Sequence, residues 1–258
     1  MESCIAKIPF VKADAAPSPS SLFEKKSFCV GDFTLNYGIY LPRGYSEEKK
    51  YPLILFFHGA GERGSDNEAQ FKIAINQFFK NPASPVYECI VVCPQCPTEY
   101  KWVNVPEWTD TSYSTDEIPE SRPLAAVVNL ISHLQETLAV DPDRIYSTGL
   151  SMGAYATWDL LVRHTELFAA AIPVCGGADY RYASRLADLP IFTFHGDIDD
   201  VVPPNGTEAM VNELIRLGSQ KINCIYYVGG NHGIWENAFS TEGIFDWLLS
   251  QRKSDRIK

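Results

Sequence analysis

Short runs rich in β-branched and aromatic residues alternate along this chain with stretches whose apolar residues recur at helical spacing. Several runs, such as residues 53–57, are apolar throughout, which is typical of strands covered on both faces. The alternation predicts a mostly parallel sheet with helices on both sides. We predict strands at residues 33–41, 53–57, 89–93, 144–148, 169–174, 191–194 and 222–227, and helices at residues 68–79, 124–138, 152–164, 207–217 and 234–249.

The chain shows no internal repeat and no linker that would divide it, which predicts a single α/β domain. Residues 1–26, with Pro17, Pro19 and several serines, predict a flexible leader before a folded domain at residues 27–258. Residues 94–121 form a long connection rich in Pro, Thr, Ser and aromatic residues. Connections of this length in a compact domain are usually functional or mobile.

Composition and charge exclude several classes of function. Lys and Arg number 22 and Asp and Glu 32, so the net charge of −10 repels phosphate backbones and anionic lipid surfaces. No apolar run approaches the ~20 residues of a membrane span. We therefore expect neither a nucleic-acid nor a membrane partner. Residues 1–21 lack the pattern of a signal peptide, so we expect a cytoplasmic protein, with a secreted mature form left open.

The seven cysteines are an odd number, and most lie in or beside apolar strand-like runs. There a free thiol packs as a small core side chain, in agreement with a reducing compartment. Cys93 and Cys96 form a C-x-x-C, but no second Cys or His pair stands at zinc spacing. We predict that Cys93 belongs to the core and that the protein binds no metal.

The strongest chemical signal is the G-x-S-x-G motif at residues 149–153, which holds Ser151 between Gly149 and Gly153. A strand pattern precedes the motif and a helical pattern follows it. A sharp strand-to-helix turn lifts the serine hydroxyl out of the sheet, and its strained backbone requires small neighbours. Ser151 is therefore the predicted nucleophile.

A serine nucleophile needs a base, and five histidines are available. His133 and His164 fall within helical patterns. His58 and His195 each end an apolar strand and precede a glycine, so we predict hydrogen-bonded structural roles for both. His232 lies in a loop between the last strand and the last helix, where an accessible base is expected. We predict that His232 is the base.

The triad acid should lie between Ser151 and His232 in the chain if the order is Ser, Asp, His. Asp197, Asp199 and Asp200 follow a predicted strand end directly. Spacing alone does not choose among these three carboxylates.

With these motifs, the chain resembles the α/β-hydrolase superfamily, in particular the small serine esterases grouped with dienelactone hydrolase and the catalytic domain of prolyl oligopeptidase. The resemblance covers nearly the whole chain from about residue 34 and implies an α/β-hydrolase fold with a central sheet of about eight strands and no cofactor. Residues 27–258 would then be the catalytic domain. The matching motifs lie at residues 57–64, 93–97, 149–153, 195–203 and 231–235.

The resemblance also assigns the remaining catalytic parts. The aspartate of the family segment H-G-x-x-D-x-x-V-P falls on Asp199, with Asp200 as the second candidate and Asp197 supporting the turn. The oxyanion hole would use the backbone N–H of Met152 and that of Ala60, with the N–H of Gly61 as the alternative to Ala60.

Two departures from the family favour ester hydrolysis. The nucleophile is serine where dienelactone hydrolases have cysteine, and the chain is too short for the propeller of prolyl oligopeptidases. We predict a serine carboxylesterase for short or aromatic esters, of the acetyl or feruloyl type, of plant-derived compounds. A serine peptidase, a thioesterase and a non-catalytic binding protein are the alternatives, and the enzyme would be a monomer or small homo-oligomer.

Aromatic residues suggest how such a substrate would bind. Trp102, Trp108 and Trp235 are the predicted substrate-binding residues, because they could form a flat apolar wall on which aromatic acids stack. The alternative is that they pack the long loop onto the sheet. Arg63 would either hold a substrate carboxylate or anchor its own loop.

Overall fold

The computed structural model describes residues 4–14, 18–108 and 113–256. Their strands form one nine-stranded sheet in the order β1-β9-β8-β7-β6-β4-β5-β3-β2. Strand β3 pairs antiparallel with β2 and with β5, and the other neighbouring strands are parallel. The strands are β1 (Cys4–Pro9), β2 (Glu24–Val30), β3 (Phe33–Tyr40), β4 (Tyr51–Phe57), β5 (Ile90–Gln95), β6 (Val140–Leu150), β7 (Ala170–Val174), β8 (Ile191–Gly196) and β9 (Ile222–Val228).

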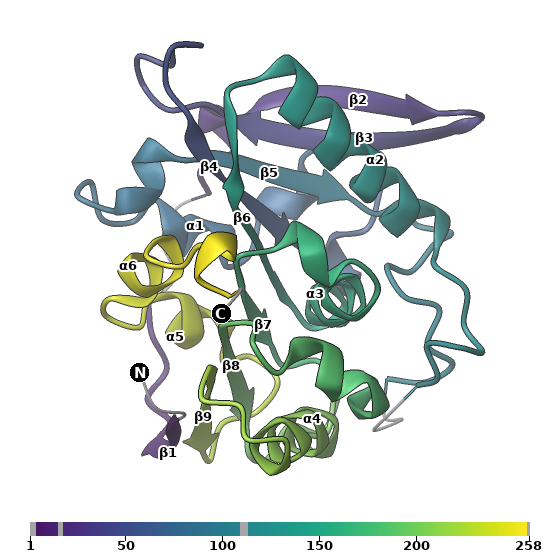
Figure 1. Cartoon of the computed structure of the whole chain (residues 1–258), viewed down its shortest axis with the longest axis vertical. Helices are drawn as coiled ribbons and strands as arrows, with labels where there is room; N and C mark the ends of the chain where they lie inside the picture. The colour runs from purple at the N-terminus through teal and green to yellow at the C-terminus, as the bar shows by residue number, and fades with distance from the viewer. Residues whose placement is uncertain (1–3, 15–17, 109–112, 257–258) are drawn as a thin grey trace.

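Helices cover both faces of this sheet (Figure 1). Each face carries its own cluster of buried hydrophobic side chains, and β4 between them is buried at every position. This explains why the strand is apolar throughout, and it confirms the predicted mostly parallel sheet with helices on both sides. The helices on one face are α2 (Arg122–Thr137), α3 (Met152–Arg163) and α4 (Asn205–Arg216), and those on the other are α1 (Ile75–Phe78), α5 (Trp235–Phe239) and α6 (Ile244–Leu249).

Two predicted helices are broken in the structure. The helix predicted at 68–79 becomes a short 3-10 turn followed by α1, because Ala74 between them has φ 64° and donates its N–H to Glu236 Oε1 at 3.3 Å. The helix predicted at 234–249 divides into α5 and α6 at Gly243, where φ is 73°. In both cases the apolar residues keep a helical spacing across a residue with positive φ, so the sequence pattern did not reveal the break.

The expectation of a flexible leader at residues 1–26 is wrong for much of that segment. Strand β1 pairs in parallel with the edge strand β9 over six positions, and β2 begins at Glu24. Most of the side chains of β1 are exposed, including the apolar Ile5 and Ile8, so burial of an apolar face does not order the strand. Backbone hydrogen bonding to an open sheet edge orders it instead. Pro17, which suggested flexibility, lies outside the described residues.

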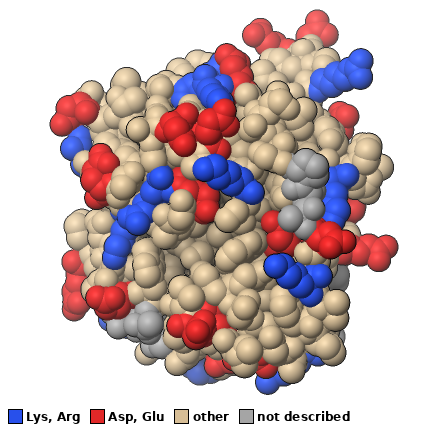
Figure 2. Space-filling model, turned by 180° about the vertical axis from the view of Figure 1, so that it is seen from behind, with Lys and Arg blue, Asp and Glu red and all other residues tan. Residues whose placement is uncertain are grey.

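Charged side chains of both signs are interspersed on the molecular face opposite to that of Figure 1 (Figure 2). The net charge is therefore distributed on this face and not separated into large patches of one sign. None of the helices in the described part of the chain is long and apolar enough to cross a membrane.

Candidate active site

Ser151 occupies a strained turn between β6 and α3. Its backbone has φ 53° and ψ −121°, outside the usual regions for a residue with a side chain. Packing requires the two flanking glycines, since a Cβ on Gly153 would lie 2.0 Å from the Phe57 carbonyl oxygen and one on Gly149 would lie 2.4 Å from that of Gly153. The chain therefore forms the predicted sharp turn at the carboxyl end of the central strand, and the Ser151 hydroxyl is presented there.

His232 meets Ser151 from the loop between β9 and α5. The distance between His232 Nε2 and Ser151 Oγ is 2.8 Å, and that between His232 Nδ1 and Asp199 Oδ2 is 2.7 Å. The loop that carries Asp199 and the loop that carries His232 pack closely, since a Cβ on Gly196 would lie 2.2 Å from the Gly230 carbonyl oxygen. The structure thus joins three predicted side chains into one hydrogen-bonded chain.

Asp199 is the buried member of that chain. Its Oδ1 accepts hydrogen bonds from the backbone N–H groups of Val201 and Val202 at 3.0 and 2.9 Å. Burial alone would raise the pKa of Asp199, but hydrogen bonds from His195, His232 and the Val202 amide outweigh it and hold the pKa well below the ordinary value. Asp199 is therefore a carboxylate at neutral pH.

Asp197 and Asp200, the two aspartates close to Asp199 in the chain, do not contact His232. Asp200 is exposed to solvent, and Asp197 Oδ1 accepts the backbone N–H of Gly229 at 2.7 Å. Asp197 thus supports the turn, as the family resemblance implied, and of the three carboxylates Asp199 is the one that contacts His232.

The proposed oxyanion donors flank Ser151. Met152 is the first residue of α3, where a backbone N–H has no partner within the helix. Ala60 begins a 3-10 turn (Ala60–Glu62) that approaches the serine closely, because a Cβ on Gly59 would lie 3.7 Å from Ser151 Cβ. The geometry is compatible with two amides beside the serine hydroxyl.

His58 and Arg63 hold the loop that carries Ala60. His58 Nδ1 lies 2.6 Å from the Gly59 carbonyl oxygen, and its Nε2 accepts the Cys96 N–H at 2.9 Å. Burial, with a smaller contribution from the Arg63 charge, lowers the pKa of His58 to about 4, so the ring is neutral. The structural role predicted for His58 is confirmed.

The Arg63 guanidinium donates to three backbone carbonyls, those of Ala60 at 3.0 Å, Thr98 at 3.3 Å and Tyr100 at 3.2 Å. These contacts favour the loop-anchor alternative for Arg63 over a substrate-binding one.

The three tryptophans predicted to bind substrate lie in different environments. Trp102 has no exposed surface, and its Nε1 donates to the His58 carbonyl oxygen at 3.3 Å. The substrate-binding prediction for Trp102 is therefore wrong, because the ring is part of the core beside the loop that carries Ala60. Trp108 is half-buried against Tyr155, one helical turn beyond Ser151. Trp235 is half-buried with its ring edge-on to His232, 5.4 Å between centroids.

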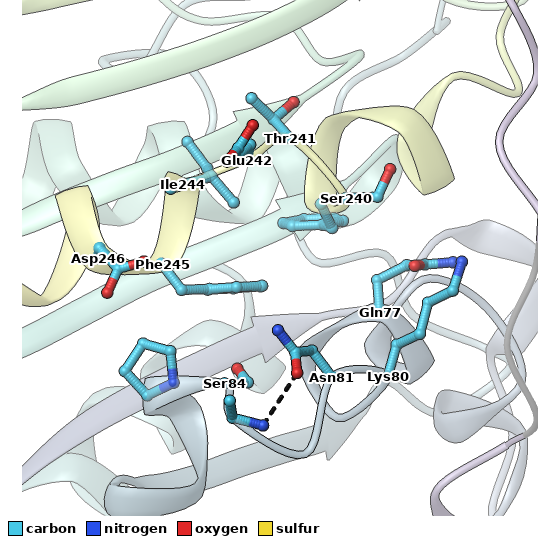
Figure 3. Close-up of a pocket in the computed structure, with 14 residues that line it drawn as sticks. Gln77, Lys80, Asn81, Ser84, Ser240, Thr241, Glu242, Ile244, Phe245 and Asp246 are labelled. Atoms are coloured by element: carbon cyan, nitrogen blue, oxygen red, sulfur yellow. Dashed lines mark hydrogen bonds between the residues drawn. The ribbon is translucent and has the colours of Figure 1, made fainter.

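Two of the cavities among the described residues differ in whether they reach His232. One of about 330 Å³ lies beside His232 and Asp200, and the N-terminal segment contributes Phe10 and Lys12 to its wall. Sequence reasoning missed this contribution because it treated the segment as a leader. Another cavity of about 400 Å³ lies between the α1 region and α5–α6, lined by residues such as Gln77, and contains no triad residue (Figure 3).

Sequence reasoning also did not connect Cys175 and His195 with the triad. Both are buried beside Asp199, with the potential ligand atoms of the three residues within 4.8 Å of one another. The His195 nitrogens and both Asp199 oxygens already make hydrogen bonds, so this cluster does not offer free ligand atoms for a metal ion. Cys175 has φ 54°, and its position after an apolar strand and before two glycines was the available signal.

Comparison with known sequences gives a family match. The profile of the phospholipase/carboxylesterase family matches residues 45–242. A probable carboxylesterase SOBER1-like of Arabidopsis thaliana is 26% identical, covering 78% of this chain and 79% of its own. Poly(3-hydroxyalkanoate) depolymerase C of Paucimonas lemoignei is 23% identical, covering 72% of this chain. The chain spans only 41% of that depolymerase.

Solved structures give the same picture. A thermostable esterase superposes with a TM-score of 0.80 at 34% identity, over 90% of this chain and 64% of the other. A feruloyl esterase module from Clostridium thermocellum, complexed with sinapinate, has a TM-score of 0.61 at 16% identity, over 96% of this chain and 94% of the other, which is a likeness of fold alone. Because the family profile covers most of the chain, including Ser151, Asp199 and His232, this protein belongs to the phospholipase/carboxylesterase family and has the α/β-hydrolase fold.

Proposed function

We propose that the protein is a carboxylic ester hydrolase with Ser151, His232 and Asp199 as its catalytic triad. The observation that carries this proposal is the continuous chain of contacts from Ser151 Oγ through His232 to Asp199, with distances of 2.8 and 2.7 Å. Membership of the phospholipase/carboxylesterase family supports the same reaction class.

In this mechanism Ser151 Oγ attacks the acyl carbon while His232 Nε2 takes the hydroxyl proton. His232 then gives that proton to the leaving alcohol, and the acyl group remains on Ser151. A water molecule, deprotonated by His232, then attacks the acyl carbon. His232 returns that proton to Ser151 Oγ as the bond between Oγ and the acyl carbon breaks, which releases the acid and restores the free enzyme. Asp199 keeps the Nδ1 hydrogen of His232 in place and stabilises the imidazolium formed in each step.

The negative oxygen of each tetrahedral intermediate would be bound by the Met152 and Ala60 amides, with Gly61 as the alternative to Ala60. Two observations support this assignment: each residue begins a helical turn, and a Cβ on Gly59, the residue before Ala60, would lie 3.7 Å from Ser151 Cβ. Preorganised donors of this kind are worth about 3 kcal/mol each in transition-state stabilisation.

For substrate class we propose small-molecule esters with short or aromatic acyl groups, of the acetyl or feruloyl type. The half-buried rings of Trp235, edge-on to His232, and of Trp108, against Tyr155 of α3, support an aromatic acyl or alcohol group. Feruloyl esterase B of Piromyces equi is 25% identical over 64% of this chain, although the chain covers only 29% of that enzyme.

Hydrolysis of a nitrophenyl ester panel and of methyl ferulate by the wild type and Ser151→Ala tests this function. We expect Ser151→Ala to lower kcat by at least about 1,000-fold without changing the far-UV spectrum or the melting temperature. Anilide and thioester versions of one acyl group compare peptidase and thioesterase activity directly. Turnover that survives in Ser151→Ala, or wild-type turnover of the anilide alone, would contradict the proposal.

A further inference from the structure

Two histidines are buried at strand ends beside the triad, and their hydrogen-bond partners differ. His58 has one partner that accepts, the Gly59 carbonyl, and one that donates, the Cys96 amide. A neutral ring satisfies both, with its hydrogen on Nδ1. His195, which has no exposed surface, has a different set of partners.

The Nε2 atom of His195 faces only acceptors. It lies 2.8 Å from the Val202 carbonyl oxygen and 3.3 Å from Asp199 Oδ2. A carbonyl oxygen cannot donate, and Asp199 is held as a carboxylate by the hydrogen bonds described above. Nε2 therefore carries a hydrogen.

The Nδ1 atom of His195 lies 2.8 Å from Thr207 Oγ1, which could in principle donate or accept. The Thr207 hydroxyl has a single hydrogen, and its oxygen is 2.7 Å from the Gly176 carbonyl oxygen. Because that carbonyl can only accept, the hydroxyl hydrogen is directed to Gly176 and a lone pair faces Nδ1. A neutral Nδ1 would leave one of these two short contacts without a hydrogen in a buried site, which is costly.

We propose that His195 is an imidazolium ion that pairs with Asp199 inside the protein and acts as a positioning residue for the triad carboxylate. This inference rests on the proposed function, in which Asp199 orients His232. The pairing offsets the cost of burying two charges, since Asp199 Oδ2 and the Val202 and Thr207 oxygens receive both His195 hydrogens.

The surroundings of His195 are consistent with a single positive charge. Asp199 and Cys175 lie beside it, and His232 lies on the far side of Asp199. Tyr226 is its register partner on β9, and Glu208 follows Thr207 in α4, so neither neighbour adds a second positive charge. Burial, and then the Asp199 carboxylate, raise the pKa of the Cys175 thiol well above its ordinary value, so the thiol keeps its hydrogen and can donate to Asp199. Thus Asp199 is the negative partner of two rings, His195 behind it and His232 in front.

A positively charged His195 would affect both the position and the charge of the Asp199 carboxylate. It fixes the carboxylate that contacts Nδ1 of His232, and its charge weakens the attraction of Asp199 for a protonated His232. His232 then releases its proton to the leaving alcohol more readily. Loss of the His195 charge should therefore move the rise of activity with pH to higher pH.

The direct test is the protonation of His195 in the wild-type enzyme, measured by two-dimensional NMR of protein labelled with ¹⁵N in histidine. We expect both His195 ring nitrogens to show the chemical shifts of protonated nitrogens at pH 7.5, while His58 shows one protonated and one unprotonated nitrogen. The His195 signals are assigned by their loss in His195→Gln. An unprotonated nitrogen in His195 at this pH would overturn the proposal.

Kinetics of His195→Gln test the positioning role. This substitution removes the charge but keeps an amide donor, and we expect kcat to fall about 10- to 100-fold with KM within about twofold. The rise of kcat/KM with pH should move upward by about one pH unit. His164→Gln is the matched control, because His164 also pairs with a carboxylate, Glu120 at 2.8 Å, but lies outside the site, and its profile should match the wild type.

Thr207→Val tests the His195 charge in a second way, because it should remove the charge without replacing His195. It removes the acceptor at Nδ1, so we expect that nitrogen to lose its hydrogen and the pH profile to move in the same direction. A lower kcat with an unmoved profile in both variants would mean a purely structural role and would refute the proposal. Failure of the proposed function is distinguishable, because it would appear as retained turnover in Ser151→Ala and would leave the NMR result unaffected.

Discussion

At the scale of single residues, Asp199 and Asp200 are adjacent in the chain but lie in opposite environments. Asp199 is buried and receives hydrogen bonds from two backbone amides and from His232, whereas Asp200 is exposed and lines the neighbouring cavity. Their sequence context could not separate them without the family resemblance, because both follow the same strand end. Contacts across the sheet edge distinguish them.

We expect Asp199→Asn to lower kcat by roughly 10,000-fold, because an amide that donates toward His232 would favour the wrong tautomer. Asp200→Asn should change kcat little, since its side chain does not contact His232 in the structure. Steady-state kinetics on one nitrophenyl ester measures both variants under the same conditions. The opposite ranking would make Asp200 the triad acid.

At the scale of elements, the turn from β6 to α3 depends on close backbone approach. Gly153→Ala would place a methyl group 2.0 Å from the Phe57 carbonyl oxygen, so strand and helix must separate. We expect Gly153→Ala to lower the free energy of unfolding by about 1–3 kcal/mol, the usual cost of overpacking. Activity should fall as well, because the same turn holds Ser151. Urea unfolding measures the change.

Gly61→Ala is the control for that measurement. Nothing lies within 4 Å of a Cβ at Gly61, so its stability should stay within about 0.5 kcal/mol of the wild type. Equal losses of stability in the two variants would show that the close approach at Gly153 is not the cause.

A second element-scale prediction concerns the turn before the 3-10 helix Ala69–Phe71. Hydrogen bonds from the Ala69 amide, the Gln95 side chain and the Glu68 amide lower the pKa of Asp66 to about 2. Because the folded pKa is below the unfolded one, this stabilisation is present above about pH 4 and is lost as pH falls toward 2.

Asp66→Asn should therefore destabilise the protein at pH 7 and have no effect on stability near pH 2. Asp66 is largely exposed, and solvent screening limits the expected loss at pH 7 to about 1 kcal/mol. Urea unfolding of both proteins at several pH values measures the difference. A difference that is constant with pH would show that the Asp66 charge is not responsible.

At the scale of the whole molecule, the N-terminal segment is part of the sheet and of the site wall. Strand β1 extends the sheet beyond β9, and the Asn237 side chain fixes the following residues by bonding the Val11 carbonyl at 2.5 Å and the Ala13 N–H at 3.0 Å. The segment thereby places Phe10 and Lys12 beside His232.

We expect a variant that lacks residues 1–14 to melt about 5 °C lower, because it loses an edge strand, and to have a raised KM with kcat largely retained. Ser151, Asp199 and His232 follow other strands, so their mutual contacts should survive. Thermal unfolding and ester kinetics measure these effects. Asn237→Ala, which keeps β1 but frees residues 11–13, should lower the melting temperature less. An unchanged melting temperature and KM in the truncated protein would mean that the segment is a dispensable leader after all.

Features that arise from local pattern can be predicted from the amino-acid sequence alone. Apolar runs predicted most of the parallel strands, because a strand covered on both faces must be apolar at every position. The glycines around Ser151 predicted the sharp turn, because its backbone leaves no room for side chains. His232 was predicted from its position after the last strand.

Features that depend on contacts between distant segments become visible only in the tertiary structure. Strand β1 buries little of its side-chain surface, and it is ordered by backbone bonds to β9, more than 200 residues later. Trp102 is buried beside the loop that carries Ala60, where its Nε1 donates to the His58 carbonyl oxygen. The contacts of Asp199 and His195 arise where loops after β7, β8 and β9 meet. Local sequence pattern does not encode such meetings, because Asp199 meets His232, and His195 meets Thr207, from another part of the chain.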